Sequence, residues 1–168
     1  MKRFTLGAMV SVVMMVAGAG LSSAQMGGNS VFNASDTREL KNFRLTDDMV
    51  QKFQKATNDL IAYGKAHRSD SDKNAKASAS GGNISDMVNS FSKVPQFETI
   101  LHNTGMTPKE YADTMLVLST GYAMVSMQKQ GMAVSKMTDL VSAENSDYIK
   151  RNYDHLSKVL EQLNHASD

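Results

Sequence analysis

Apolar residues recur at intervals of three and four positions through most of this chain, which is the spacing of one face of an α-helix. The pattern fills four segments of nearly equal length: 47–67, 84–104, 108–130 and 144–164. At the rise of an α-helix each segment is about 31–35 Å long, and no strand pattern competes with them. Four amphipathic helices of one length pack most simply as an antiparallel bundle. We therefore predict an all-α, antiparallel four-helix-bundle-like fold.

Local signals set several ends of these helices. Thr107 and Glu110 form a capping box with Pro108 at the first helical position, so a helix is predicted to begin at Pro108. Gly131 follows the last periodic residue of that helix and is typical of a helix end. In the second segment, Pro95 removes a backbone donor, which predicts that the second helix is broken there.

The first 24 residues have the three parts of a secretory signal peptide. Lys2 and Arg3 give a positive start, residues 4–21 carry no charge, and small residues then lead to Ala24. We expect cleavage between Ala24 and Gln25, and a mature protein that is periplasmic or secreted from a bacterium, with no membrane contact after cleavage. An uncleaved membrane anchor is the alternative, but glycines within the apolar run and the small-residue site favour cleavage.

The mature chain would have 144 residues, which suits one domain with a core of its own. Two of the 18 basic residues are removed with the signal peptide, which leaves 16 basic and 17 acidic residues in the mature chain. This near-neutral net charge provides no positive surface potential to attract nucleic acid. The chain has no cysteine, which excludes a disulfide framework and a thiolate zinc site. We divide it into a mobile N-terminal arm over 25–44 and a helical domain over 45–165. Residues 68–83 hold no large apolar side chain and are predicted to form a flexible loop.

Three predicted helix openings carry recognisable caps: Leu45-Thr46, Gly105-Met106-Thr107-Pro108-x-Glu110-Tyr111 and Ser142-x-Glu144-Asn145. With these caps, the stretch over about residues 39–163 resembles a group of small exported bacterial α-helical proteins of unknown function. The resemblance implies export and a helical fold. It implies no activity, ligand or catalytic residue.

Residues with catalytic or metal-binding chemistry do not gather in any motif. The four histidines stand at 67, 102, 155 and 165, and no two of them have the spacing of three or four that would place both on one helix face. No nucleophile elbow surrounds a serine, and no glycine-rich phosphate loop occurs. We therefore expect no enzyme, no catalytic residue, no cofactor and no metal site.

The helix over 108–130 is more apolar than a bundle helix needs to be. Residues 116–128 carry no charge, and their apolar side chains spread beyond one stripe. Either this helix is the central one, or part of it meets a partner. We expect a contact face made by Leu116, Val117, Met124 and Met127. The predicted function is a non-enzymatic binding or interaction protein, whose partner would be a second copy, another protein or a small apolar ligand.

Methionine thioethers suggest an alternative function, because they are soft ligands for Cu(I) and the chain has no thiolate. That alternative is a periplasmic copper-handling protein. Met124 and Met127 share one side of the helix, but no third soft ligand lies one turn away. Met132 and Met137 follow Gly131 and could join the pair only if the chain folds back. Methionine also fills irregular apolar space, and we prefer this role for the pair.

Overall fold

The computed structural model describes residues 32–66, 83–92, 95–134 and 137–165, which form helices and contain no strand. In chain order the helices are α2 (Ala34–Asn42), α3 (Asp47–Ala66), α4 (Ile84–Ser92), α5 (Pro95–Thr104), α6 (Pro108–Lys129), the 3₁₀-helix η2 (Met137–Asp139), α7 (Ala143–Arg151) and α8 (Tyr153–His165). The all-α class is therefore confirmed for the described residues. The predicted signal peptide, with its cleavage site at Ala24 and Gln25, and the predicted loop up to residue 82 lie outside them.

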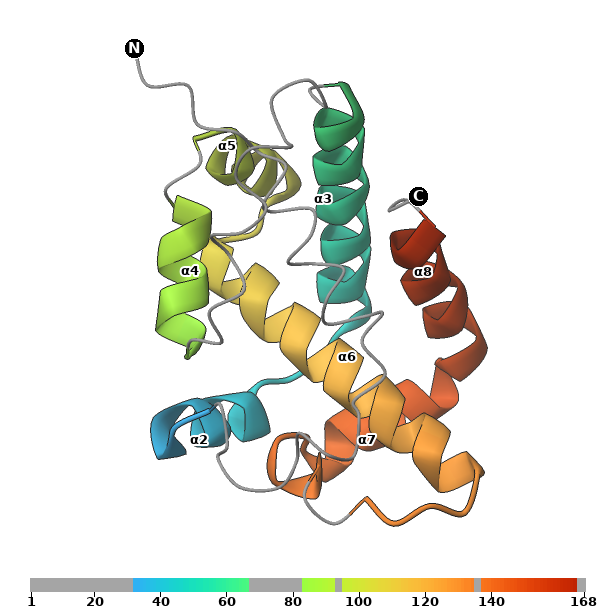
Figure 1. Cartoon of the computed structure of the whole chain (residues 1–168). Coiled ribbons are helices and arrows are strands. Elements are labelled where there is room, and N and C mark those ends of the chain that lie inside the picture. Colours follow the sequence, from blue (N-terminus) through green and yellow to red (C-terminus); the bar gives the residue numbers. More distant parts are fainter. Residues whose placement is uncertain (1–31, 67–82, 93–94, 135–136, 166–168) are drawn as a thin grey trace.

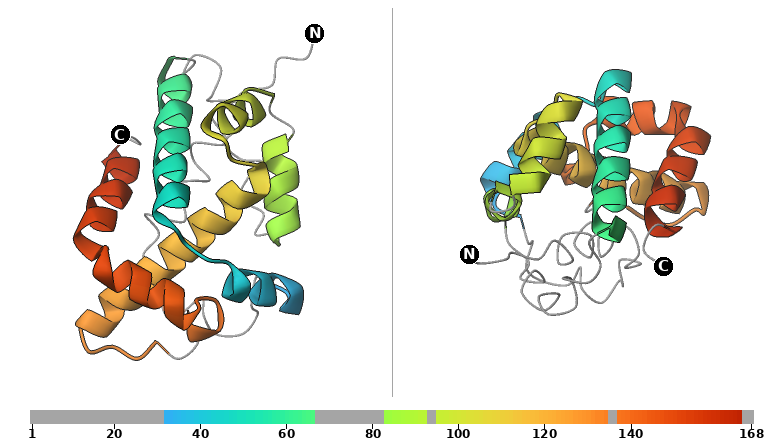
Figure 2. Two further views of the ribbon diagram at one scale, coloured as in Figure 1. Left: turned by 180° about the vertical axis from the view of Figure 1, so that it is seen from behind. Right: turned by 90° about the horizontal axis from the view of Figure 1, so that it is seen from above.

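The central element is α6, which crosses the molecule obliquely (Figures 1 and 2) and contacts α2, α3, α4, α5, α7 and η2. Residues 111–118 of this helix are all buried. A helix that is apolar on most sides needs neighbours on most sides, and the fold supplies them. Among the described helices, none combines the length and the apolar character that crossing a bilayer requires.

The antiparallel arrangement of four equal helices is not confirmed. α3 and α8 contact each other and run in the same direction (Figures 1 and 2), while α6 lies at an angle to both. The helices also differ in length, because two of the predicted segments are divided. The break in the second segment is confirmed: α4 ends at Ser92 and α5 begins at Pro95, where the missing N–H of proline costs no helical bond.

The last segment, predicted as one helix over 144–164, is in fact two helices that meet at Asn152. The backbone N–H of Asn152 donates to the carbonyl of Tyr148 at 3.1 Å, and its side-chain amide donates to the same carbonyl at 3.0 Å. A short amide side chain that competes for a backbone carbonyl favours a helix end. The apolar spacing continues across Asn152 without a change of period, and so it does not reveal the break.

The stretch predicted as a mobile arm over 25–44 contains a helix, α2, in its second half. Asn33 begins this helix, because its side-chain oxygen accepts hydrogen bonds from the backbone N–H groups of Ser35 and Asp36. The carboxylate of Asp36 accepts in return from the backbone N–H of Asn33. Leu40 then enters the core. A helix with one fully buried apolar side chain gives no periodic signal.

Both predicted ends of α6 are confirmed. The hydroxyl of Thr107 accepts from the backbone N–H of Glu110 at 3.1 Å, and the carboxylate of Glu110 accepts from the N–H of Thr107 at 2.8 Å. At the other end Gly131 has a φ of 73°, a left-handed value that glycine adopts without strain. The helix is therefore bounded by the signals that the sequence shows.

The first half of α6 lies in an aromatic core, made of Phe53, Phe91, Phe97 and Tyr111. The ring of Tyr111 lies 5.0–5.8 Å from the other three, centroid to centroid, and those of Phe91 and Phe97 stack at 4.4 Å. The hydroxyl of Thr57 donates to the carbonyl of Phe53, so it accepts from the phenol of Tyr111 at 3.0 Å. Burial raises the pKa of Tyr111 far above its usual range, which keeps the phenol protonated as a donor.

Candidate functional site

The four residues predicted to form a contact face do not form one open surface. Leu116 and Val117 are buried in the main core, Met124 is buried in a separate apolar cluster, and Met127 is half-buried beside it. The chain itself covers three of the four, because α6 is the central helix, and their role as a contact face stays a prediction.

The second apolar cluster lies against the last turns of α6 and is here called the methionine cluster. Its members are Met124, Met137 and Val141, with Ala123, Met127, Val134 and Leu140 packed against them. They come from α6, from η2 and from the connections around η2. A short turn thus covers the methionine cluster on this half of α6, in addition to the helix α7.

A chain reversal at Gly131 brings Met137 back to α6. The N–H of Met132 donates to the carbonyl of Met127 at 3.0 Å, and the N–H of Gly131 donates to that of Gln128 at 3.0 Å. This pair of bonds is a Schellman motif, which ends the helix and turns the chain. A third thioether therefore joins Met124 and Met127, which sequence spacing alone did not place there.

A pocket of about 350 Å³ opens beside the methionine cluster, between α6, η2, α7 and the end of α2. Its apolar lining includes Met124 and Val141, which belong to the cluster. The other lining residues are Lys41, Gln128, Thr138, Ser142, Ala143, Ser146, Asp147 and Lys150. One apolar wall thus adjoins a ring of polar and charged groups drawn from four parts of the chain.

Two lysines and one aspartate supply the charges of this pocket. Lys150 Nζ lies 3.6 Å from Asp147 Oδ1, one turn away on α7, and both side chains are exposed. Lys41, in the last turn of α2, has no ion pair within the part of the chain that the structure describes. The charge of Asp147 is offset by Lys150, so Lys41 leaves the pocket with a positive excess.

The two serines of the pocket differ in how they are used. Ser142 begins α7: its Oγ accepts from the N–H of Asn145 at 3.2 Å and from Arg44 Nη1 at 3.0 Å. Ser146 lines the pocket, and no described residue forms a hydrogen bond with its Oγ. Its hydroxyl is therefore free to bond to a molecule in the pocket.

Asn145 holds the start of α7, and with it one wall of the pocket. Its side-chain amide donates to the carbonyl of Phe43 at 2.7 Å, and its Oδ1 accepts from the N–H of Leu45 at 2.9 Å. Outside this buried pair, Arg44 and Glu144 form an ion pair at 2.9 Å. Hydrogen bonding to its own backbone N–H and the charge of Arg44 lower the pKa of Glu144.

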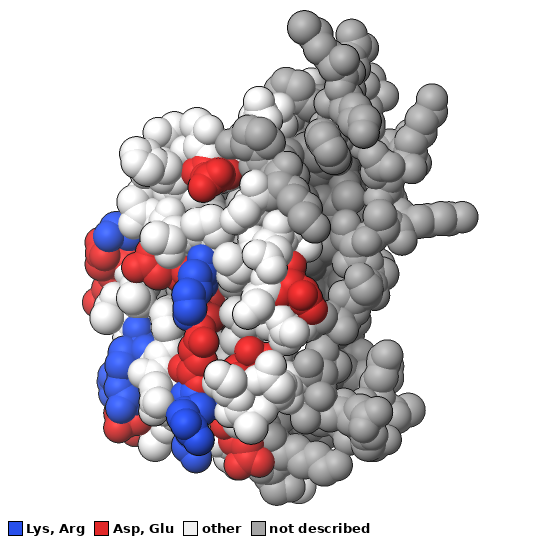
Figure 3. Space-filling model, turned by 90° about the vertical axis from the view of Figure 1, so that its left-hand side faces the viewer, with Lys and Arg blue, Asp and Glu red and all other residues white. Residues whose placement is uncertain are grey.

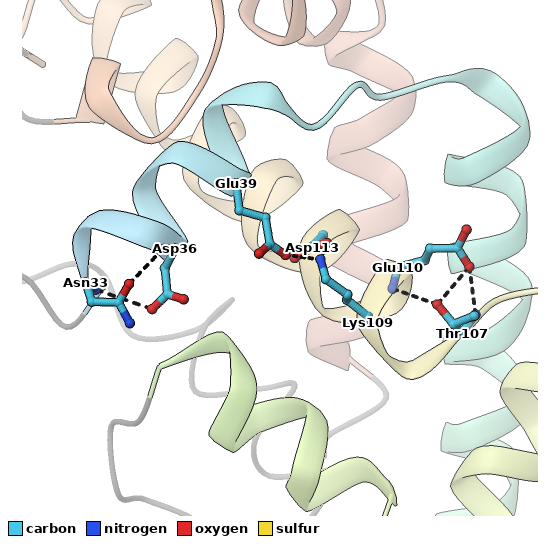
Figure 4. A network of polar contacts seen from close by, with 7 residues as sticks. All are labelled: Asn33, Asp36, Glu39, Thr107, Lys109, Glu110 and Asp113. Atoms are coloured by element: carbon cyan, nitrogen blue, oxygen red, sulfur yellow. Dashed lines mark hydrogen bonds and ion pairs between the residues drawn. The ribbon is translucent and has the colours of Figure 1, made fainter.

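A second polar network holds α2 against α6 (Figure 4). Lys109 Nζ on α6 contacts the carboxylate of Glu39 on α2, and it lies 2.8 Å from Asp113 Oδ2 one turn along α6. The side chain of Asp113 is 4% exposed, so this ion pair is partly withdrawn from water. Lys41 follows Glu39 by two residues, and the network therefore fixes the helix that brings Lys41 to the pocket.

The other surfaces of the described chain show fewer features of a binding site. Basic and acidic side chains are interspersed on the face shown in Figure 3, without a patch of one sign in its described part. His102 and His155 are exposed on α5 and α8, and His67 and the side chain of His165 lie outside the description. No group of three His, Asp or Glu side chains able to hold a metal occurs among the described residues.

Lys41 and Ser146, which line the pocket, were not predicted from the sequence. Ser142 and Asn145 did stand out as helix caps, and that signal correctly marks the start of α7. It gives no indication that Asn145 binds a segment 100 residues earlier. Comparison with protein families, with curated proteins and with solved structures finds no match to this chain.

Proposed function

We propose that this protein is an exported, non-enzymatic binding protein that holds a small ligand in the pocket between α6, η2, α7 and α2. The observation that carries the proposal is the composition of the pocket wall. An apolar surface that includes the thioether of Met124 adjoins polar side chains, among them Lys41, which has no described ion pair, and Ser146, whose hydroxyl no described hydrogen bond uses. Small-molecule sites combine these two features, and their volumes begin at about 300 Å³.

A small ligand is favoured over a protein partner or a second copy of the chain. A docking surface for a protein is usually an exposed apolar patch. Among the described residues, Met132 is the one large apolar side chain that is exposed. The apolar residues first considered for a contact face are mostly covered, whereas the pocket leaves Met124 within reach of a small molecule.

The proposal can be tested by nuclear magnetic resonance with a library of small fragments. Binding should shift the backbone amides of η2 and α7. Gln128 lines the pocket at an exposed position of α6, so Gln128→Trp should block the pocket while leaving the core intact. Gln96→Trp, on the exposed side of α5, is the matched control. Fragments that bind elsewhere, or equally well to Gln128→Trp, would contradict the proposal.

Export is part of this proposal and rests on the signal-like start of the chain. Removal after Ala24 should give a mature protein that begins at Gln25, in the periplasm or the medium. The intact mass of the exported protein decides the point. The likeness to small exported helical proteins stays a prediction of the same kind.

Copper handling remains a second candidate because of one observation, the return of Met137 to Met124 and Met127. Three thioethers in one cluster would be a soft-ligand set suited to Cu(I). We still expect a packing role, and hence no retention of Cu(I) against a competing chelator. Tight Cu(I) binding by the parent protein, lost when Met124 and Met127 are both replaced by leucine, would favour copper handling instead.

A further inference from the structure

We propose that the ligand of this pocket is a small anion, namely a carboxylate on a short apolar chain. This inference rests on the proposed function and adds the chemical class of the ligand. It is carried by three independent features that meet at the pocket: an unpaired lysine, a buried serine without a partner and an apolar wall. Each feature selects one part of such a molecule.

Lys41 selects the negative charge. It lies in the last turn of α2, and no described acidic side chain pairs with it. The other lysine of the pocket, Lys150, is 3.6 Å from Asp147, a distance longer than a direct hydrogen bond. A carboxylate in the pocket would therefore find one free ammonium group and a second that is only loosely held.

Ser146 selects a hydrogen-bond acceptor. The residue lines the pocket, and its hydroxyl is not used by the described protein. Ser142 and Ala143, at the start of α7, also line the pocket, and the N-terminal end of a helix favours negative charge. The carboxylate would lie between this end of α7 and Lys41, with the hydroxyl of Ser146 donating to one oxygen.

Met124 and Val141 select the rest of the molecule. Both side chains belong to the methionine cluster, and both line the pocket. An apolar tail that contacts them is removed from water, and flexible thioethers adapt to its shape. The volume of about 350 Å³ favours a short tail over a long lipid chain.

The test compares two probes of equal length, hexanoate and hexan-1-ol, which differ in the anionic group. Amide shifts over residues 138–150 give the affinities for the full mature chain. Hexanoate should bind more tightly than the alcohol, and added salt should weaken hexanoate alone. Lys41→Gln should weaken hexanoate by roughly fivefold, as expected for an exposed ion pair, and leave hexan-1-ol unchanged.

Two further variants separate the roles. Ser146→Ala should weaken hexanoate without altering the melting temperature, since the hydroxyl has no partner to lose. Lys158→Gln is the matched control, because Lys158 is an exposed lysine on α8 that has no described ion pair and does not line the pocket. Equal losses in Lys41→Gln and Lys158→Gln would show a general charge effect and overturn the inference.

The failure of this inference can be told apart from failure of the binding function. If both probes bind alike and Lys41→Gln changes neither, the pocket binds apolar molecules and the anionic class is wrong. If neither probe binds while other fragments do, the binding function stands and the carboxylate is wrong. If no fragment and no probe shifts the amides of η2 and α7, both proposals are wrong.

Discussion

The two halves of α6 are buried by different means. The first half lies among aromatic rings from α3, α4 and α5, and its Tyr111 is held by ring contacts and by a hydrogen bond to Thr57. The second half packs against α7, and it is also covered by η2 and by thioethers from both sides of a chain reversal. Rigid rings carried by helices fill the first half, whereas flexible thioether side chains adjoin a pocket beside the second. The two ends of one helix thus differ in how they are packed, and the proposed binding pocket lies beside the second.

The two halves should differ most in the loss of stability when one buried side chain in each is truncated to alanine. Phe97→Ala removes a fully buried ring from the aromatic core and should cost about 3–5 kcal/mol of unfolding free energy. Met137→Ala should cost about 2 kcal/mol, near the lower end for such changes, because the turn around η2 can collapse onto α6. Denaturant unfolding measures both. An equal or greater loss in Met137→Ala would break the comparison.

Gly121 lies between the two halves and tests how closely α7 packs on α6. An alanine Cβ at this position would lie 2.3 Å from Ile149 Cδ1, and Ile149 is fully buried. Gly121→Ala should therefore lower the free energy of unfolding by about 1–3 kcal/mol through overpacking. The higher helix propensity of alanine should offset part of this loss.

Ile149→Val removes the Cδ1 methyl group that the new Cβ would contact. Combining it with Gly121→Ala gives a double-mutant cycle that measures this contact. The double variant should lose less stability than the two single variants together. Additive losses would mean that Ile149 and residue 121 are not in contact, and that α7 lies further from α6.

The cap at the start of α6 should have a smaller effect. Thr107→Ala removes the acceptor of the N–H of Glu110 and should cost about 1 kcal/mol, while Thr107→Asp should be nearly neutral. Thermal or denaturant melts give the two values. If both changes are silent, the first turn of α6 contributes little to the stability of the aromatic half.

The smallest effect is expected from a change that keeps volume in the methionine cluster. Replacing Met124 and Met127 together by leucine should cost less than about 1.5 kcal/mol. Phe97→Leu in the aromatic core changes both shape and ring contacts, and it should cost more. A larger loss in the double methionine variant would show that the thioethers are as closely fitted as the rings.

Sequence analysis succeeded where the cause of a structure is local. The capping box at Thr107, the glycine at 131 and the proline at 95 each act within a few residues, and all three mark ends that the structure has. The uncharged run within α6 left two alternatives, a central helix or a helix that meets a partner, and the contacts show α6 at the centre of the described helices.

The candidate site depends on contacts between distant segments and could not be predicted in the same way. Asn145 binds backbone groups of Phe43 and Leu45, about a hundred residues earlier. Met137 reaches α6 only because the chain reverses at Gly131. No periodic pattern or motif in the sequence indicates either contact. A pocket that depends on both can therefore be recognised only in the folded chain.

The methionine cluster also gives this protein an order in which oxidants would attack it. Oxidation turns a thioether into a polar sulfoxide. Met132 is 44% exposed and can be oxidised while the fold stays closed, whereas Met137 is 2% exposed and does not line the pocket. Peroxide reaches Met137 only when the turn around η2 lifts from α6. The rate at which the sulfoxide of Met137 forms therefore measures how often the turn beside the pocket opens.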